Sequence, residues 1–186
     1  MATVGVVAIQ GDFERHAAAF GRCGADVVLV KTPEQLAGVE RIVIPGGEST
    51  TVGKLMERYG LGAAIVSAAE GGTPVWGTCM GMILMAKEVE GGEQYRLGLL
   101  DVTVRRNAFG AQVHSFEDSI VFKGLEGAVT GVFIRAPVAA VCGEGVCVLA
   151  EYGGQVVAVR EGRLFATSFH PELTDDTRLH EWFLGI

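Results

Sequence analysis

The sequence predicts a three-layer α/β fold, in which a mostly parallel central sheet has helices on both faces and contains some antiparallel strands. In the first half of the chain, short apolar, β-rich runs alternate with helix-like stretches. Several of these runs are continuous rather than alternating, which is typical of strands covered on both faces. In the second half, shorter β-rich runs with turn residues between them indicate antiparallel strands.

Strand and helix candidates follow one another regularly up to residue 87. The runs 27–30 and 42–44 are continuously apolar, so we expect both strands to be covered on both faces. We expect strands at residues 4–9, 26–30, 41–45 and 74–78. We expect helices at residues 12–23, 49–59, 60–70 and about 79–87. This alternation is typical of a parallel sheet with helical crossovers.

The second half contains shorter strand candidates and one helix. A Gly-Gly pair at 153–154 between two β-rich runs predicts a hairpin. Thr174 is the predicted N-cap of a last helix over residues 175–184, with Asp175 and Asp176 in its first turn. The strands are expected at residues 99–106, 119–122, 131–135, 146–152, 155–160 and 163–169.

Length and composition limit the class of protein. With 186 residues, 49% of them hydrophobic and 20% charged, the chain is expected to fold as one domain over residues 1–186. A net charge of -7 with scattered Lys and Arg argues against a nucleic acid partner. Every apolar run is shorter than the roughly 20 residues that span a bilayer, and a signal-peptide pattern is missing, so we expect a cytoplasmic protein. The four cysteines are expected to be reduced thiols, and their spacing indicates no metal site.

The strongest motif is a strand that runs into Gly77-Thr-Cys79-Met-Gly81 and then into an apolar helix. Glycines on both sides of Cys79 permit the sharp strand-to-helix turn of a nucleophile elbow. A thiol at a helix N-terminus is also stabilised as the reactive thiolate by the helix dipole. Cys79 is therefore a candidate nucleophile, and the alternative is a buried cysteine on a glycine-rich turn.

A base and an orienting acid are supplied by His170-Pro171-Glu172 near the end of the chain. Residues two apart in an extended segment point to the same side, so His170 and Glu172 are expected to lie together. Glu172 can then fix the imidazole tautomer while His170 takes the proton of the thiol. The alternative for His170 is a hydrogen-bonded core histidine.

A third segment, Pro45-Gly46-Gly47-Glu48-Ser49, follows a strand and precedes a helix. Two glycines let the backbone approach a ligand closely. The backbone N–H of Gly47, together with that of Met80, is our candidate oxyanion hole. The run lacks the spacing of a phosphate-binding loop.

Together these three segments resemble the class I, or triad-type, glutamine amidotransferases. Within that family, five segments of this chain are similar to the glutaminase subunits of pyridoxal-phosphate synthases, and the similarity covers nearly the whole chain. These are residues 5–11 (GVVAIQG), 45–51 (PGGESTT), 105–110 (RRNAFG), 131–137 (GVFIRAP) and 168–173 (SFHPEL).

The resemblance implies a flavodoxin-like fold and the hydrolysis of L-glutamine to glutamate and ammonia without a cofactor. It also implies a partner, a barrel-shaped pyridoxal-phosphate synthase subunit that uses the ammonia to make vitamin B6. By the resemblance, glutamine is bound by Gly47, Glu48, Ser49, Arg106, Ile134 and Arg135. Either arginine is suited to the substrate α-carboxylate and Glu48 to its ammonium group, although an arginine outside a motif is more often a surface charge.

Two features depart from the family pattern or lie outside it. Met80 stands where the family elbow usually has a small residue, so its side chain must find room beside Cys79. The remaining histidines, His16, His114 and His180, are expected to be plain polar residues, with His16 and His180 on helix surfaces.

Three other functions fit part of the pattern. A glutaminase for another synthase, such as the one that makes imidazole glycerol phosphate, shares the elbow and the His-Pro-Glu motif, but the segments at 106–107 and 134–135 argue against it. The other two are a regulatory subunit without catalysis and a cysteine peptidase of similar topology. Because the Gly46-Gly47 peptide is flexible, we expect glutaminase activity to depend on the bound synthase.

Overall fold

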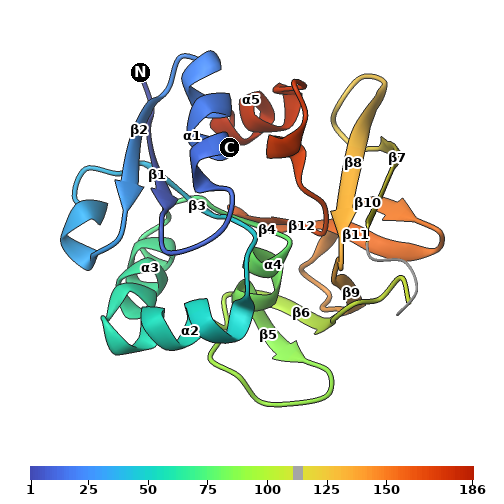
Figure 1. Ribbon diagram of the computed structural model, residues 1–186, viewed down its shortest axis with the longest axis horizontal. Helices are drawn as coiled ribbons and strands as arrows, with labels where there is room; N and C mark the ends of the chain where they lie inside the picture. Colours follow the sequence, from blue (N-terminus) through green and yellow to red (C-terminus); the bar gives the residue numbers. More distant parts are fainter. Residues whose placement is uncertain (111–114) are drawn as a thin grey trace.

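A computed structural model, which describes residues 1–110 and 115–186, confirms the three-layer α/β architecture (Figure 1). Ten strands of the described residues form one sheet, in the order β2-β1-β3-β4-β12-β11-β9-β6-β5, with β10 paired to β11. Neighbouring strands run parallel throughout the first five. These five are β2 (Asp26–Val30), β1 (Thr3–Val7), β3 (Arg41–Ile44), β4 (Val75–Thr78) and β12 (Leu164–Thr167).

The rest of the sheet contains the antiparallel pairs that the second half of the sequence predicts. β11 pairs antiparallel with β12, β9 and β10, and β9 with β6, whereas β5 and β6 are parallel. The predicted Gly153-Gly154 turn joins β10 to β11. A separate antiparallel pair, β7 with β8, stands beside this end of the sheet (Figure 1). The bounds are β5 (Ala86–Val89), β6 (Leu100–Arg105), β7 (Ser115–Val121), β8 (Ala128–Ile134), β9 (Val138–Cys142), β10 (Cys147–Tyr152) and β11 (Gln155–Glu161).

The parallel half of the sheet has a helical layer on each face (Figure 1). Helices α1 (Phe13–Arg22) and α5 (Arg178–Leu184) cover one face, and α2 (Ser49–Arg58), α3 (Leu61–Glu70) and α4 (Met80–Met85) cover the other. Side chains of a strand alternate between the two faces of the sheet. Val43 and Trp76 therefore belong to the core under α1 and α5. The core on the opposite face contains Ile42, Ile44 and Val75. Two short 3-10 helices, η1 (Pro33–Leu36) and η2 (Pro171–Leu173), complete the elements.

The structure differs from the sequence prediction in the burial of β2, the end of α4 and the presence of β9. β2 is an edge strand, and Leu29 keeps 38% of its surface exposed, so a continuous apolar run did not mean burial on both faces here. The helix expected to reach residue 87 ends at Met85, and β5 begins at once. β9 was not predicted, because its short run of small apolar residues (VAAVC) without alternation gives a weak strand signal.

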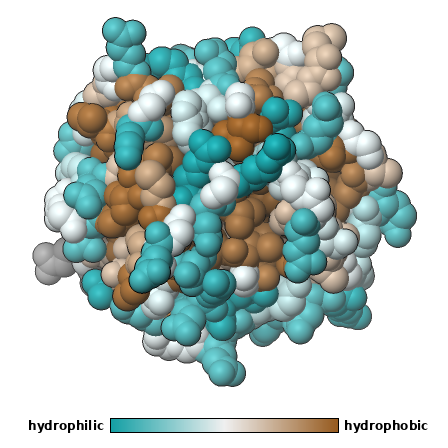
Figure 2. Space-filling view, turned by 180° about the vertical axis from the view of Figure 1, so that it is seen from behind, coloured by the Kyte–Doolittle hydropathy of each residue, from teal (hydrophilic) through white to brown (hydrophobic). Residues whose placement is uncertain are grey.

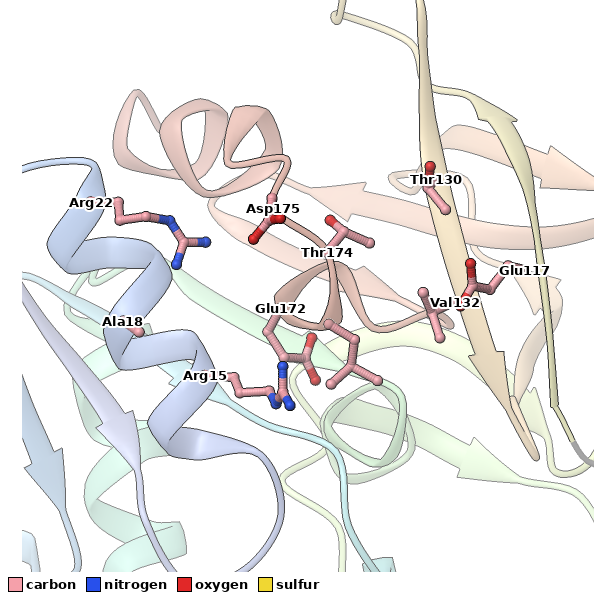
Figure 3. Close-up of a pocket in the computed structure, with 10 residues that line it drawn as sticks. Arg15, Ala18, Arg22, Glu117, Thr130, Val132, Glu172, Thr174 and Asp175 are labelled. Carbon is pink, nitrogen blue, oxygen red and sulfur yellow. The ribbon is translucent and has the colours of Figure 1, made fainter.

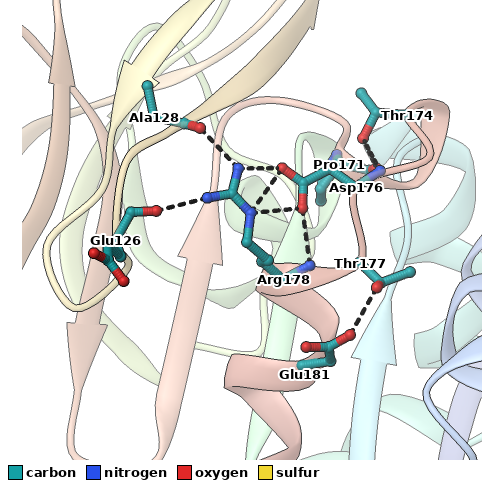
Figure 4. A network of polar contacts seen from close by, with 8 residues as sticks. All are labelled: Glu126, Ala128, Pro171, Thr174, Asp176, Thr177, Arg178 and Glu181. Atoms are coloured by element: carbon teal, nitrogen blue, oxygen red, sulfur yellow. Dashed lines mark hydrogen bonds and ion pairs between the residues drawn. The ribbon is translucent and has the colours of Figure 1, made fainter.

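The last helix begins at Arg178 rather than at residue 175. Thr174 does not cap the helix, since its hydroxyl donates to the Pro171 carbonyl of η2 and accepts from the backbone N–H of Asp176. The Asp176 carboxylate instead accepts from the backbone N–H and the guanidinium of Arg178 (Figure 4). Arg178 also donates to the carbonyls of Glu126 and Ala128, which ties the start of α5 to the start of β8.

The surface of the face opposite to that of Figure 1 carries hydrophobic patches separated by hydrophilic residues (Figure 2). Across the described residues, the large hydrophobic side chains that remain exposed include Leu29, Tyr59, Val121, Ile134 and Val141. Within residues 1–110 and 115–186, none of the helices has the length and apolar character needed to cross a lipid bilayer.

Candidate active site

Cys79 lies on the sharp turn between β4 and α4, as the elbow motif predicts. Its backbone is in a strained conformation with a φ of 49°, and its N–H donates to the carbonyl of Thr167 on β12 at 2.8 Å. Only glycine fits at the two flanking positions, because a Cβ at Gly77 would overlap the backbone of Gly81, and one at Gly81 the carbonyl of Ile44. The turn therefore holds the thiol at the carboxyl end of the central strand.

His170 and Glu172 lie together beyond the end of β12. The Nδ1 atom of His170 is 2.8 Å from Oε1 of Glu172, and the two residues are only 6% and 3% exposed. The backbone N–H of His170 donates to the Val132 carbonyl of β8 at 2.8 Å, which fixes the start of the segment. The segment is not extended as expected, since η2 begins at Pro171, yet the 3-10 turn still brings the two side chains into contact.

The charge state of this pair follows from its surroundings. Burial alone would lower the pKa of His170, but hydrogen bonds with Cys79 and Glu172 outweigh it and raise that pKa to about 10. Burial would raise the pKa of Glu172, but the charge and hydrogen bonds of His16 and His170 hold it well below the ordinary range. An ionised carboxylate therefore supports a cationic imidazole beside the thiol, which favours the thiolate.

The predicted site residues line one cavity of about 480 Å³. Glu172 is the exception, because it lies behind His170. The predicted residues at the cavity wall are Gly47, Glu48, Ser49, Cys79, Met80, Arg106, Ile134, Arg135 and His170. The wall also contains residues that were not predicted as site residues, namely Gln10, Gly11, Asp12, Gly46, Ile83 and Asn107.

The glycine loop after β3 packs directly against the triad. A Cβ at Gly46 would lie 2.5 Å from Cε1 of His170, so the ring occupies the space that a side chain would need. Gly47 has a φ of 155°, and the Met80 methyl group lies 3.4 Å from the place of a Gly47 Cβ. Met80 is 1% exposed and belongs to the core on the α2 side, so its larger side chain has found room. The oxyanion role of the Gly47 and Met80 N–H groups stays a prediction.

Hydrogen bonds hold Glu48, Ser49 and Arg106 in place at the cavity wall. The carboxylate of Glu48 caps α2 by accepting from the N–H groups of Thr50 and Thr51, and these bonds lower its pKa to about 2. Its backbone N–H donates to Oε1 of Gln10 at 3.0 Å. Arg106 donates through Nη2 to the Ser49 hydroxyl at 2.7 Å. Ser49 thus holds one of the two predicted arginines at the cavity wall.

Strained backbone is concentrated at this cavity. Among the described residues, the positive φ angles outside glycine belong to Cys79, Asn107 (47°) and Arg135 (45°), and all three line the cavity. The carbonyl of Ile134, next to Arg135, lies 3.8 Å from the Cys79 sulfur. Conformations of this kind cost about 1–3 kcal/mol each and are typical of functional sites.

Two of the remaining histidines are not surface residues, which corrects the sequence prediction. His16 of α1 and His180 of α5 are fully buried. Nε2 of His16 lies 3.2 Å from Oε2 of Glu172 and 3.2 Å from the Thr78 hydroxyl, and its Nδ1 lies 3.1 Å from Nε2 of His180. The two helices pack against each other over β4, so their facing sides carry these imidazoles inward. The spacing of His16 four residues before buried Phe20 was the available signal. His114 lies outside the described residues.

A second cavity, of about 560 Å³, lies on the far side of Glu172 (Figure 3). Figure 3 shows Arg15 and Arg22 of α1 on the left, Glu172 and Asp175 in the middle, and β8 with Thr130 and Val132 on the right. On the other side of Glu172, potential metal-ligand atoms of Asp12, His170 and Glu172 lie within 4.8 Å of one another. His170 and Glu172 already bond each other, so the triad accounts for this cluster.

Comparison with known proteins agrees with this geometry. Residues 6–185 match the model of the SNO glutamine amidotransferase family. The chain is similar to the pyridoxal 5'-phosphate synthase subunit PdxT of Geobacillus kaustophilus (49% identity, covering 98% of this chain and 93% of the relative). The PdxT protein of Herpetosiphon aurantiacus is 52% identical, with 99% and 100% covered. A crystal structure described as a glutamine amidotransferase superposes with a TM-score of 0.94 at 50% identity, covering 98% of this chain and 97% of that one.

Proposed function

We propose, from the premise that this chain belongs to the SNO glutamine amidotransferase family, that it is the glutaminase subunit of a pyridoxal 5'-phosphate synthase. It hydrolyses L-glutamine to L-glutamate and ammonia. The observation that carries the proposal is the contact of His170 with Glu172 beside the strained Cys79, at a cavity that also holds Arg106 and Arg135. This set supplies a nucleophile, a base and cationic groups for an amino acid substrate.

The chemistry follows from the positions of the three triad residues. The Cys79 thiolate attacks the side-chain amide carbon of glutamine, and the carbonyl oxygen becomes an oxyanion near the N–H groups of Gly47 and Met80. His170 protonates the departing ammonia and then serves as the base for the water that hydrolyses the γ-glutamyl thioester. Glu172 stabilises the imidazolium at both steps.

Glutamine binds in the cavity of about 480 Å³. Arg106 and Arg135 are the cationic groups at its wall and suit the α-carboxylate of the substrate. The Glu48 carboxylate is engaged in capping α2, but it keeps the negative charge that an ammonium group requires. Gly47, Ser49 and Ile134 complete the predicted binding set through backbone and hydroxyl groups.

The partner is a barrel-shaped synthase subunit, which receives the ammonia before it escapes to solvent. The name of the relatives, a subunit of pyridoxal 5'-phosphate synthase, supports a partner of this kind. We further propose that the chain acts in the cytoplasm as one domain over residues 1–186, with neither a nucleic acid partner nor a cofactor of its own. The net charge of -7 supports the first of these exclusions.

The test is glutamate release from L-glutamine by the purified chain, with and without a co-purified synthase subunit. Cys79→Ala provides the blank, and its circular dichroism and melting temperature show whether the fold is intact. We expect turnover that requires Cys79 and that rises when the synthase is present. Wild-type turnover by Cys79→Ala would contradict the assignment of Cys79 as the nucleophile. Equal turnover with and without the synthase would contradict activation by the partner. Hydrolysis of peptides in place of glutamine would indicate a peptidase.

A further inference from the structure

Behind the triad, four buried side chains form a continuous polar chain that the proposed chemistry does not use in full. It runs from His180 on α5 through His16 on α1 to Glu172 and His170. The three contacts measure 3.1 Å, 3.2 Å and 2.8 Å, and His180, His16 and Glu172 are each 3% exposed or less. Helix α1, near the start of the chain, and the segment from His170 to His180, near its end, therefore meet around one carboxylate.

The direction of the hydrogen bonds in this chain is set by the carboxylate. An ionised Glu172 can only accept, so His170 donates through Nδ1–H to Oε1. Nε2 of His16 lies 3.2 Å from Oε2 of Glu172, as an ion-pair contact, and 3.2 Å from the Thr78 hydroxyl, so a proton on this nitrogen faces both oxygens. Nδ1 of His16 faces Nε2 of His180 at 3.1 Å, so the proton between these two nitrogens is carried by one of the two rings. Burial, followed by the nearby charge of His16, lowers the pKa of His180 to about 3, so His180 itself stays neutral.

The contact with His16 matters because Oε2 of Glu172 has little other support. It is buried and makes no hydrogen bond of regular geometry among the described residues, which leaves the 3.2 Å contact with Nε2 of His16 as its support. A buried carboxylate oxygen without a donor is costly, and the adjoining cavity of about 560 Å³ offers the carboxylate a place to rotate toward water or Arg15. Rotation in that direction would withdraw Oε1 from His170.

We infer that His16 is a positioning residue of the glutaminase, which holds Glu172 in the rotamer that orients His170 toward Cys79, with His180 in contact with the other ring nitrogen of His16 from behind. The inference deepens the proposed function and rests on it for its effect on turnover. Its effect on the triad itself can be measured without glutamine.

Two amide replacements of His16 separate its two contacts. In His16→Gln the side-chain NH2 reaches about as far as Nε2 and can still donate to Glu172, whereas in His16→Asn it reaches only as far as Nδ1 and leaves Oε2 without a donor. Both variants are similar in polarity and remove the imidazole. Phe183→Leu, in the same core beside Trp76, is the control for lost packing.

The first readout is the alkylation of Cys79 by iodoacetamide in the isolated chain as a function of pH, with Cys79→Ala as the blank for the other thiols. We expect the rate at pH 7 to fall about tenfold in His16→Asn, because the thiolate loses an oriented imidazolium, and to be largely retained in His16→Gln.

The second readout is glutamate release by the complex with the synthase. There kcat should fall about tenfold or more in His16→Asn with KM nearly unchanged, since His16 does not touch the substrate cavity.

The acid limb of the pH profile gives a third readout. Loss of the His16 donor raises the pKa of Glu172, so the acid limb of kcat/KM should move to higher pH in His16→Asn and stay in place in His16→Gln. The titratable and charged groups that surround Glu172 are His170, His16, Arg15, Arg22, Asp12, His180, Glu117 and Asp175. All of them except His16 are unchanged in both variants.

The outcomes are distinct. The inference is overturned if Asn and Gln at position 16 behave alike in all three readouts, or if Phe183→Leu, at an equal loss in melting temperature, reproduces the His16→Asn values. If the wild-type complex releases no glutamate but alkylation still separates the Asn and Gln variants, the proposed function fails and the positioning role stands. If glutamate is released and alkylation does not separate them, only the positioning role fails.

Discussion

The imidazole of His170 lies directly on the backbone of Gly46, at a point where a Cβ would be 2.5 Å from Cε1 of the ring. Gly46 belongs to the loop after β3, and His170 follows β12, so β4 with its elbow lies between the two strands that position them. Gly46 therefore makes room for the base, beside Gly47, whose N–H is the predicted oxyanion donor. A side chain at position 46 would occupy the space in which the ring contacts Glu172.

Gly46→Ala is expected to disable the triad without unfolding the protein. The new methyl group must displace the ring, and a shift of about 1 Å in a catalytic group can cost about 100-fold in kcat. Glutamate release measures the loss, and the melting temperature checks the fold. The control is Gly21→Ala on α1, where a Cβ would meet nothing within 4 Å, so activity should be unchanged. Normal kcat in Gly46→Ala would mean that the ring can move without consequence.

Much of the fold could be predicted because hydrophobic runs and glycine turns mark the parallel half of the sheet. Local patterns were insufficient where helix and strand compete for one apolar stretch. The apolar run from Met80 ends at Ala86 and is followed by Lys87 and Glu88, which favour a helix, so pairing with β6 rather than propensity makes residues 86–89 a strand. The start of α5 was missed because the Thr174 hydroxyl bonds to the Pro171 carbonyl of η2, while the Asp176 carboxylate accepts from the backbone N–H of Arg178.

The triad was predictable because each member lies in a motif with a local physical reason. His16 and His180 have no such motif, and their contact with each other spans 164 positions. Their surface placement was predicted from helix position alone, whereas the packing of α1 on α5 turns both inward. The position of a histidine on the apolar face of a helix therefore predicts its burial better than the average exposure of histidine does.

The free energy of unfolding should depend on pH through three buried groups, His170, Glu172 and His180. A raised pKa of His170, about 10 when folded against about 6.5 when unfolded, gives stability that is present below pH 6.5 and lost as the pH rises toward 10. The lowered pKa of Glu172 gives stability that is present above pH 4.5 and lost below it. His180, at about 3 when folded, reduces stability below pH 6.5 because only the unfolded chain takes up its proton.

The free energy of unfolding should therefore have its maximum near pH 6.5. Urea denaturation at a series of pH values between about 4 and 10 measures it. In Cys79→Ala the alkaline decline should become shallower, because the thiol that helps to hold the proton on His170 is gone. An unchanged alkaline slope in this variant would show that another group causes the decline.

Met80→Ala should separate the side chain of the elbow from its backbone. Met80 is buried, and truncation of a core methionine to alanine costs about 2–5 kcal/mol in stability. The backbone N–H is retained, so kcat for glutamine should stay within about threefold of wild type. Met56→Ala on α2, equally buried in the same core, is the matched control. A loss of kcat in Met80→Ala alone would mean that its contact with Gly47 shapes the oxyanion site.

Ser49→Ala should weaken glutamine binding without slowing the chemistry. It removes the hydroxyl that accepts from Nη2 of Arg106 at 2.7 Å, so the guanidinium is less ordered for the substrate α-carboxylate. Loss of one such hydrogen bond corresponds to about a fivefold rise in KM, and Arg106→Gln should raise KM further, with kcat changed little in either. Arg105→Gln is the neighbouring control, because Arg105 pairs with Glu90 on the surface. Steady-state glutamate release separates KM from kcat, and an equal rise in KM for Arg105→Gln would argue against a specific role of Arg106.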